Sequence, residues 1–127
     1  MLHHVSLEVA PDDVDRTIEL FELLDFARVP APRPIAPFVT WLERGSTQIH
    51  LIHTPSATTP LLGHAAIVAT EYDASVGRLR DAGFEVEDAG ELWGERRGVR
   101  AHTRRRTARG DGGPSVPLRS LSRMLGR

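Results

Sequence analysis

Hydrophobic and polar residues alternate along Leu2–Val9, which is the pattern of a β-strand with one face on a core. Val5, Leu7 and Val9 fall on one side of such a strand, and polar residues fall on the other. We therefore expect the polar face to point away from the helix that follows. That face comprises His4, Ser6 and Glu8.

The spacing then changes to that of an amphipathic helix ending near Leu24. Pro11 suits the first turn of a helix, and the carboxylates of Asp12 and Asp13 favour its positive end. The helix has an apolar stripe made of Val14, Ile18, Phe21 and Leu24.

Three more strands are expected after this helix. Phe26–Val29 is a short strand, and the prolines of Pro30–Pro34 require a loop. Phe38–Glu43 and Thr47–His53 are strands joined by the turn Arg44–Ser46. Residues 1–54 therefore form a βαβββ module.

A linker at residues 55–61, rich in Thr, Ser and Pro, is followed by a repeat of the first pattern. The segment Leu62–Ala69 matches Leu2–Val9 at an offset of sixty residues, and this places His64 on His4. A second helix is expected at Asp73–Ala82, followed by Gly83–Val86 as a strand. Residues 62–97 therefore predict a βαβ arrangement, an incomplete second module.

Charge divides the chain where the second module should continue. Residues 1–95 contain six Arg and sixteen acidic residues, whereas residues 96–127 contain ten Arg and one acidic residue, Asp111. The segment 98–127 has no strand alternation and few apolar residues, so we expect it to be disordered.

Composition limits the other possibilities. The chain has no Cys, which excludes disulfides and thiolate chemistry. It has no long apolar run and no signal-like segment after Met1, so we expect a soluble cytoplasmic protein without a membrane anchor. Every basic residue apart from His is Arg, which is typical of a GC-rich genome.

The tandem modules resemble the vicinal oxygen chelate superfamily of glyoxalases, bleomycin-resistance proteins and extradiol dioxygenases. The resemblance covers residues 1–97. It implies an α+β fold of tandem βαβββ modules forming a cupped mixed sheet, here with a second module that lacks its last two strands. The matching segments are L-H-H-V-S-L-E-V, L-L-D-F, T-Q-I-H-L-I, L-G-H-A-A-I-V, D-A-G-F-E-V and W-G-E-R-R.

In that family a divalent metal sits in the cup, and the resemblance implies His4, His50 and His64 as ligands here. The fourth ligand is normally a Glu in a strand that this chain lacks. Strand alternation agrees, because these residues lie opposite the apolar faces of their strands. Imidazoles suit Zn²⁺, Ni²⁺, Fe²⁺ or Co²⁺. Three further histidines, His3, His53 and His102, are interpreted as ordinary surface or loop residues.

A shifted reading frame accounts for the missing strands. Read one base later, codons for residues 98–100 permit Ala-Phe-Val, and those for residues 109–111 permit Val-Glu-Met. The shifted peptide resembles the absent family strands with a Glu near position 110. We therefore interpret the tail from about Gly98 as out-of-frame translation.

Two functions follow from the resemblance. The first is a metal-dependent lyase, isomerase or dioxygenase that acts on a small oxygenated substrate and is impaired in this chain. No catalytic residue is assigned, although Glu8, on the polar face of the first strand, could substitute for the missing Glu. The alternative is a metal-free dimer that sequesters a small ligand, with Trp41 and Trp93 as stacking surfaces. We expect a homodimer. We expect no nucleic-acid binding by Arg104–Arg106, because the frame shift explains those arginines.

Overall fold

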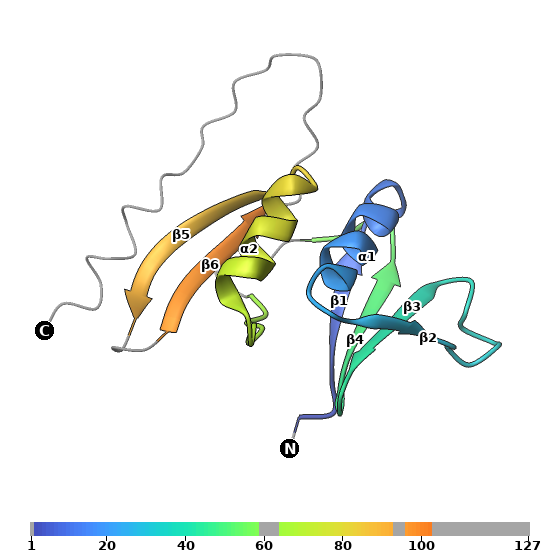
Figure 1. Cartoon of the computed structure of the whole chain (residues 1–127). Coiled ribbons are helices and arrows are strands. Elements are labelled where there is room, and N and C mark those ends of the chain that lie inside the picture. Colours follow the sequence, from blue (N-terminus) through green and yellow to red (C-terminus); the bar gives the residue numbers. More distant parts are fainter. Residues whose placement is uncertain (1, 59–63, 93–95, 103–127) are drawn as a thin grey trace, which may run out of the picture.

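The computed structural model describes residues 2–58, 64–92 and 96–102, of which residues 88–92 and 96–102 are described by their backbone alone. Two structural units follow each other along the chain (Figure 1). The first unit contains β1 (His4–Val9), the 3-10 turn η1 (Pro11–Asp13), α1 (Val14–Glu22), β2 (Ala27–Val29), β3 (Val39–Arg44) and β4 (Thr47–His53). The second contains α2 (Tyr72–Asp81), β5 (Glu85–Leu92) and β6 (Arg96–His102).

The first unit is the predicted βαβββ module. Its four strands form a sheet in the order β1-β4-β3-β2, in which β1 pairs parallel with β4 and the other pairs are antiparallel. One face of the sheet packs against α1, and Leu42 and Leu51 on that face are fully buried. The core also contains Val9, Ile18, Phe21, Phe26 and Ile49.

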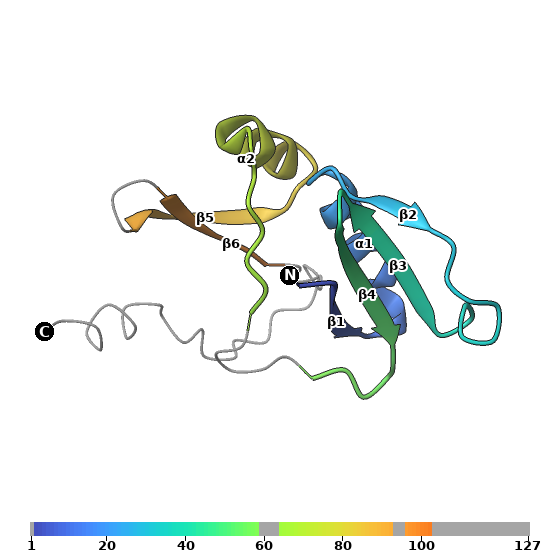
Figure 2. The same cartoon turned by 90° about the horizontal axis from the view of Figure 1, so that it is seen from below.

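The opposite side of the sheet, here called the open face, carries the polar residues of the alternating strands. His4, Ser6 and Glu8 of β1 are exposed, whereas Val5 and Leu7 pack against the core. The alternation predicted for β1 is therefore confirmed, and α1 covers only the apolar side of the sheet (Figure 2).

The second unit differs from expectation at both ends. Residues 64–69 were expected to form a strand and do not. In the first unit β1 is paired by β4, but no counterpart of β4 occurs in the described part of the second unit. Within the described residues, the segment 64–69 therefore has no neighbouring strand with which to form a ladder, and Ile67 packs against the first unit.

The strand β6 reaches His102, beyond the boundary at Arg97 where strand structure was expected to stop. It is held by antiparallel pairing with β5, which runs from Glu85↔His102 to Leu92↔Arg96. The expectation that residues 98–102 lack structure is therefore wrong. The disorder expected for residues 103–127 lies outside the described residues.

Both helices end in the same way, which explains part of the repeat. Asp25 and Gly83 adopt the left-handed backbone conformation, with φ of 67° and 82°. The amides of Phe26 and Phe84 donate to the carbonyls of Phe21 and Leu79, at 3.0 and 2.9 Å. These bonds define a Schellman motif at each helix end, and they place a buried Phe immediately after it.

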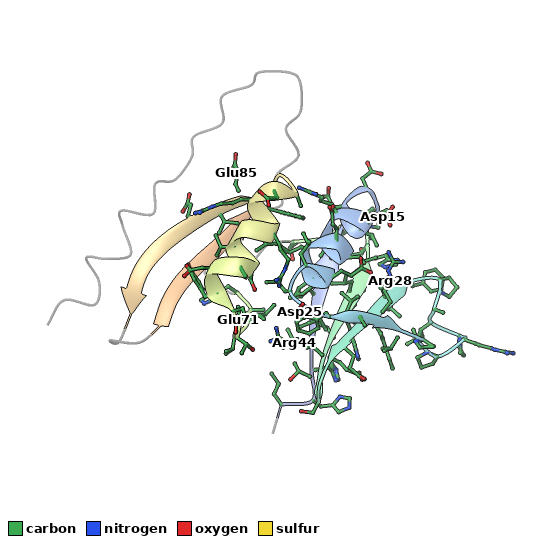
Figure 3. The ribbon with its side chains drawn as sticks, viewed as in Figure 1. Asp15, Asp25, Arg28, Arg44, Glu71 and Glu85 are labelled. Atoms are coloured by element: carbon green, nitrogen blue, oxygen red, sulfur yellow. The ribbon has the colours of Figure 1, made fainter. Side chains whose placement is uncertain are left out.

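Three arginines, here called the arginine junction, link the two units: Arg16, Arg44 and Arg78. Arg16 of α1 donates to the carbonyl of Ala82 at 2.8 Å, and Arg78 of α2 donates to the carbonyl of Leu23 at 3.0 and 3.2 Å. These carbonyls belong to the residues that cap the other helix. Asp25 and Arg44 lie where the units meet (Figure 3). Lone carbonyls at helix ends are suitable acceptors for guanidinium groups.

No helix within the described ranges is long and apolar enough to span a bilayer.

Candidate functional site

The open face brings β1, β4 and β3 together in a fixed register. His4 pairs with Gln48, which pairs with Glu43. In the next row His50 lies between Ser6 and Trp41. Residues that pair across a sheet point to the same side, so all these residues share the open face.

Three rings form a continuous stack on this face, here called the ring stack: Trp41, His50 and His4. The ring centroids of Trp41 and His50 are 4.2 Å apart, with 3° between their planes. Those of His50 and His4 are also 4.2 Å apart, with 15° between their planes. The imidazole of His50 is thus held between two other rings, and only 8% of the residue is exposed.

Hydrogen bonds fix the orientation and the tautomer of His50. The amide nitrogen of Gln48 donates to Oε2 of Glu43 at 2.7 Å, because a carboxylate only accepts. The amide oxygen of Gln48 therefore faces Nε2 of His50 at 2.9 Å and accepts its proton. In neutral His50 this assignment leaves Nδ1 unprotonated and able to bind a Lewis acid.

The electrostatics keep His50 neutral. Burial lowers the pKa of His50 below its ordinary value of 6.5, and the nearby His4 and His3 lower it further. A neutral imidazole is the form that ligates a metal. The protonation state of His50 near neutral pH is therefore suited to the expected role.

The three predicted ligands are not all brought together. His4 and His50 lie in direct contact, whereas His64 lies in the extended segment 64–69 and is not part of the ring stack. Within the described ranges, no group of three or more His, Cys, Asp or Glu side chains is arranged to hold a metal ion. Of the three expected donors, His4 and His50 therefore lie side by side as stacked rings, and His64 lies in another segment.

Sequence reasoning missed two neighbours of this pair. Nδ1 of His3, interpreted as an ordinary surface residue, lies 3.0 Å from Nδ1 of His4. Trp41 was proposed only as a stacking surface for a ligand, but it stacks on His50. The short turn at Gly45–Ser46 sets the hairpin register and could have predicted the facing of Trp41 and His50.

The other candidate residues have different partners. His53 lies on the core side of β4, with Nε2 3.0 Å from the hydroxyl of Thr40, so it is not part of the open-face site. The carboxylate of Glu8 accepts from the amide and the hydroxyl of Thr58, at 3.0 and 3.1 Å. Glu8 is thus engaged by the linker. Trp93 lies outside the described residues.

Comparison with known proteins supports a fold for this chain but no family. No family model matches the sequence, and no curated protein matches it. The structure is similar to the crystal structure of a protein from Bacillus anthracis that is named as a presumed glyoxalase family member. The TM-score is 0.60 and the sequence identity 19%, over 69% of this chain and 74% of that chain.

The chain therefore has a glyoxalase-like α+β fold, as the repeat and the strand patterns predicted. At this level of identity the similarity is one of fold. The activity has to be argued from the open face itself.

Proposed function

We propose that the open face is a small-molecule site of the glyoxalase type, in which His4 and His50 hold a divalent cation such as Zn²⁺, Ni²⁺, Fe²⁺ or Co²⁺. The observation that carries this proposal is the contact between these two imidazoles on adjacent strands. His50 is also buried, its ring is held by a hydrogen bond to Gln48, and its pKa is lowered by burial and by the neighbouring His4 and His3. The substrate class would be a small molecule with neighbouring oxygens, and the reaction an isomerisation, a lyase reaction or a dioxygenation.

The residues of this chain have distinct roles in such a site. The pair Gln48 and Glu43 holds the Nε2 proton of His50, so Nδ1 would be the nitrogen that binds a cation. A bound cation would act as a Lewis acid that stabilises negative charge on substrate oxygens. Because only two imidazoles lie together among the described residues and Glu8 is engaged by Thr58, we expect weak metal binding and impaired catalysis.

A metal-free binding protein is the second candidate, and the ring stack favours it. His50 is covered on both faces, so a planar ligand can stack only on the outer rings of the stack, Trp41 and His4. The described residues of β1, β3 and β4 on this face include the carboxylates of Glu8 and Glu43 but no Arg. Such a face suits a planar cation, and in this proposal two chains of a cytoplasmic homodimer would each offer one.

Metal binding to the full-length protein distinguishes the candidates. After removal of metal with a chelator, Zn²⁺ and Ni²⁺ are titrated by calorimetry into the wild type and into His4→Ala, His50→Ala, His64→Ala and His53→Ala. We expect His4→Ala and His50→Ala each to weaken binding by about tenfold or more. The matched control, His53→Ala, removes an imidazole from the core side of the same strand and should bind as the wild type does.

Two other outcomes would overturn the metal proposal. The first is binding of Zn²⁺ or Ni²⁺ that survives in both His4→Ala and His50→Ala, and the second is wild-type protein that takes up no metal. In the second case, the fluorescence of Trp41 in a Trp93→Phe variant is titrated with N-methylpyridinium, a planar cation. Quenching that saturates would support the metal-free candidate. Loss of metal binding in His64→Ala would show that His64 reaches this site as well.

A further inference from the structure

One corner of the open face is apolar. Ile52 of β4 pairs with Val39 of β3, and Val29 of β2 pairs with Trp41, so these side chains share that face. Three of them form a surface that is here called the apolar strip: Val29, Val39 and Ile52. Because Val29 and Val39 are both neighbours of Trp41 on this face, the strip begins where the ring stack ends.

The apolar strip keeps surface that a ligand can bury. The strand β4 lies between β1 and β3, and yet 39% of Ile52 is exposed. Val29 and Val39 are half-buried. The linker reaches the row of Ile52 at Glu8, whose carboxylate accepts from Thr58, and Ile52 is exposed beside that contact. Such a surface favours an apolar group, because the contact removes apolar area from water.

The charges around the strip disfavour an anionic ligand. The carboxylates of Glu8 and Glu43 lie on the open face, and the four strands place no Arg on it. Arg28 of β2 forms an ion pair with Glu22 on the helix side of the sheet, and Arg44 of β3 donates to carbonyls in the arginine junction. An anionic group would therefore meet like charges, whereas an uncharged group would not.

We propose that the substrate of this site is an uncharged molecule whose apolar group, of the size of a phenyl ring, rests on the apolar strip while its neighbouring oxygens lie at His4 and His50. Ile52 lies two residues beyond His50 on β4, or about 7 Å along the strand. A phenyl ring attached beside the oxygens covers that distance and lies next to Trp41, an aromatic neighbour. This inference rests on the proposed function, because it assigns the part of the substrate beyond the oxygens.

Hydroxamic acids test the strip, because each presents the same two neighbouring oxygens. Benzohydroxamic acid has a phenyl ring where acetohydroxamic acid has a methyl group. Each is titrated into the full-length protein loaded with Zn²⁺, and the methyl NMR signal of Ile52, assigned with Ile52→Val, is followed. We expect benzohydroxamic acid to shift this signal and to bind about tenfold more tightly. An unmoved signal, or affinities within about twofold of each other, would overturn the inference.

Charge and side-chain size supply two matched comparisons. The anionic 4-carboxybenzohydroxamic acid should lose most of the gain in affinity, and undiminished binding would contradict the charge argument. Ile52→Ala should reduce the preference for the phenyl ring by about threefold. The control is Ile35→Ala in the loop between β2 and β3, where Ile35 is exposed to a similar extent, 41%. Equal preferences in the two variants would show that Ile52 does not select the substrate.

Metal-free protein separates this inference from the proposed function. If the protein takes up no Zn²⁺ and benzohydroxamic acid still shifts the signal of Ile52, the apolar strip stands and the cation proposal fails. If Zn²⁺ binds and Ile52 does not respond, the proposed function stands and this inference fails. Sedimentation velocity tests the other occupant. A wild-type dimer that dissociates in Ile52→Arg would show that the strip is a contact between two copies, which would rule out the substrate.

Discussion

Asp25 adopts a backbone conformation that suits glycine, and at the equivalent position of the second unit the residue is a glycine, Gly83. Its φ of 67° is matched by 82° at Gly83, the equivalent position after the second helix. A side chain with a Cβ is disfavoured in this region, although Asp tolerates it better than most residues. The side chain of Asp25 gains only a long contact to Arg78, at 3.5 Å, and both groups are substantially exposed.

Exchanging the residue types at these two positions should change stability in opposite directions. We expect Asp25→Gly to raise the free energy of unfolding by about 0.5–1 kcal/mol, and Gly83→Asp to lower it by about 1 kcal/mol or more. At Gly83 the added Cβ would meet Arg16 at 3.6 Å, an ordinary contact, so the cost comes from the backbone. Urea unfolding measures both changes. A loss of stability in Asp25→Gly would mean that its contact with Arg78 outweighs the backbone strain.

Alternation predicted which residues of β1 and β4 lie on the open face, because a strand has a period of two. It could not predict the ring stack, which depends on how far β1 slides along β4. The register His4↔Gln48 brings the imidazole of His4 next to His50 diagonally, and a parallel pair has no short turn to set that register. The tautomer of His50 likewise depends on Gln48, whose role has no sequence signature.

Among the elements, the two helices hold each other through their ends. The guanidinium carbon of Arg16 also lies 3.5 Å from the ring centroid of Phe84. Arg16 thus makes both a hydrogen bond to Ala82 and a cation–π contact with Phe84. Arg44 completes the junction by donating to the carbonyls of Leu24 and Val68, at 2.9 and 2.8 Å. Bonds from arginine to distant carbonyls leave no periodic pattern, which is why the sequence predicted the helices but not their docking.

Substitutions in α2 test the junction. We expect Arg78→Met to lower the free energy of unfolding by about 1 kcal/mol, because it removes bonds to the carbonyl of Leu23 while keeping most of the apolar stem. The matched control is Arg80→Met on the same helix, whose bond to Val86 is longer, at 3.3 Å, and exposed. Thermal unfolding should separate the two variants. Equal effects would show that Arg78 acts through helix charge and not through the junction.

At the scale of the whole molecule, the charge of the chain changes sign at β6, the last strand that the structure describes. The first unit has all four strands, and the second has two in its described part. Strand β1 pairs with β4, whereas residues 64–69 pair with no strand in the described part of the chain. Periodicity predicted the segment as a strand because sequence patterns report local preference and not the presence of a partner.

Restoring the reading frame from about Gly98 should complete the second unit. We expect the shifted peptide to pair beside residues 64–69, so that their amides become protected from hydrogen exchange and the melting temperature rises by several degrees. Exchange measured by mass spectrometry compares the two proteins. The nucleotide sequence is the direct check, because codons that do not encode Val-Glu in the shifted frame near position 110 would end the hypothesis. A restored protein with unprotected residues 64–69 would remove its structural basis.

The parallel pairing of β1 with β4 has a consequence for the order of folding. The hairpin β3–β4 closes through two residues, so Trp41 and His50 can meet early. His4 reaches them only when a loop of more than forty residues, from His4 to Gln48, has closed. We therefore expect β1 to dock late and to detach first when the native state opens, so that the ring stack reports on the last step of folding.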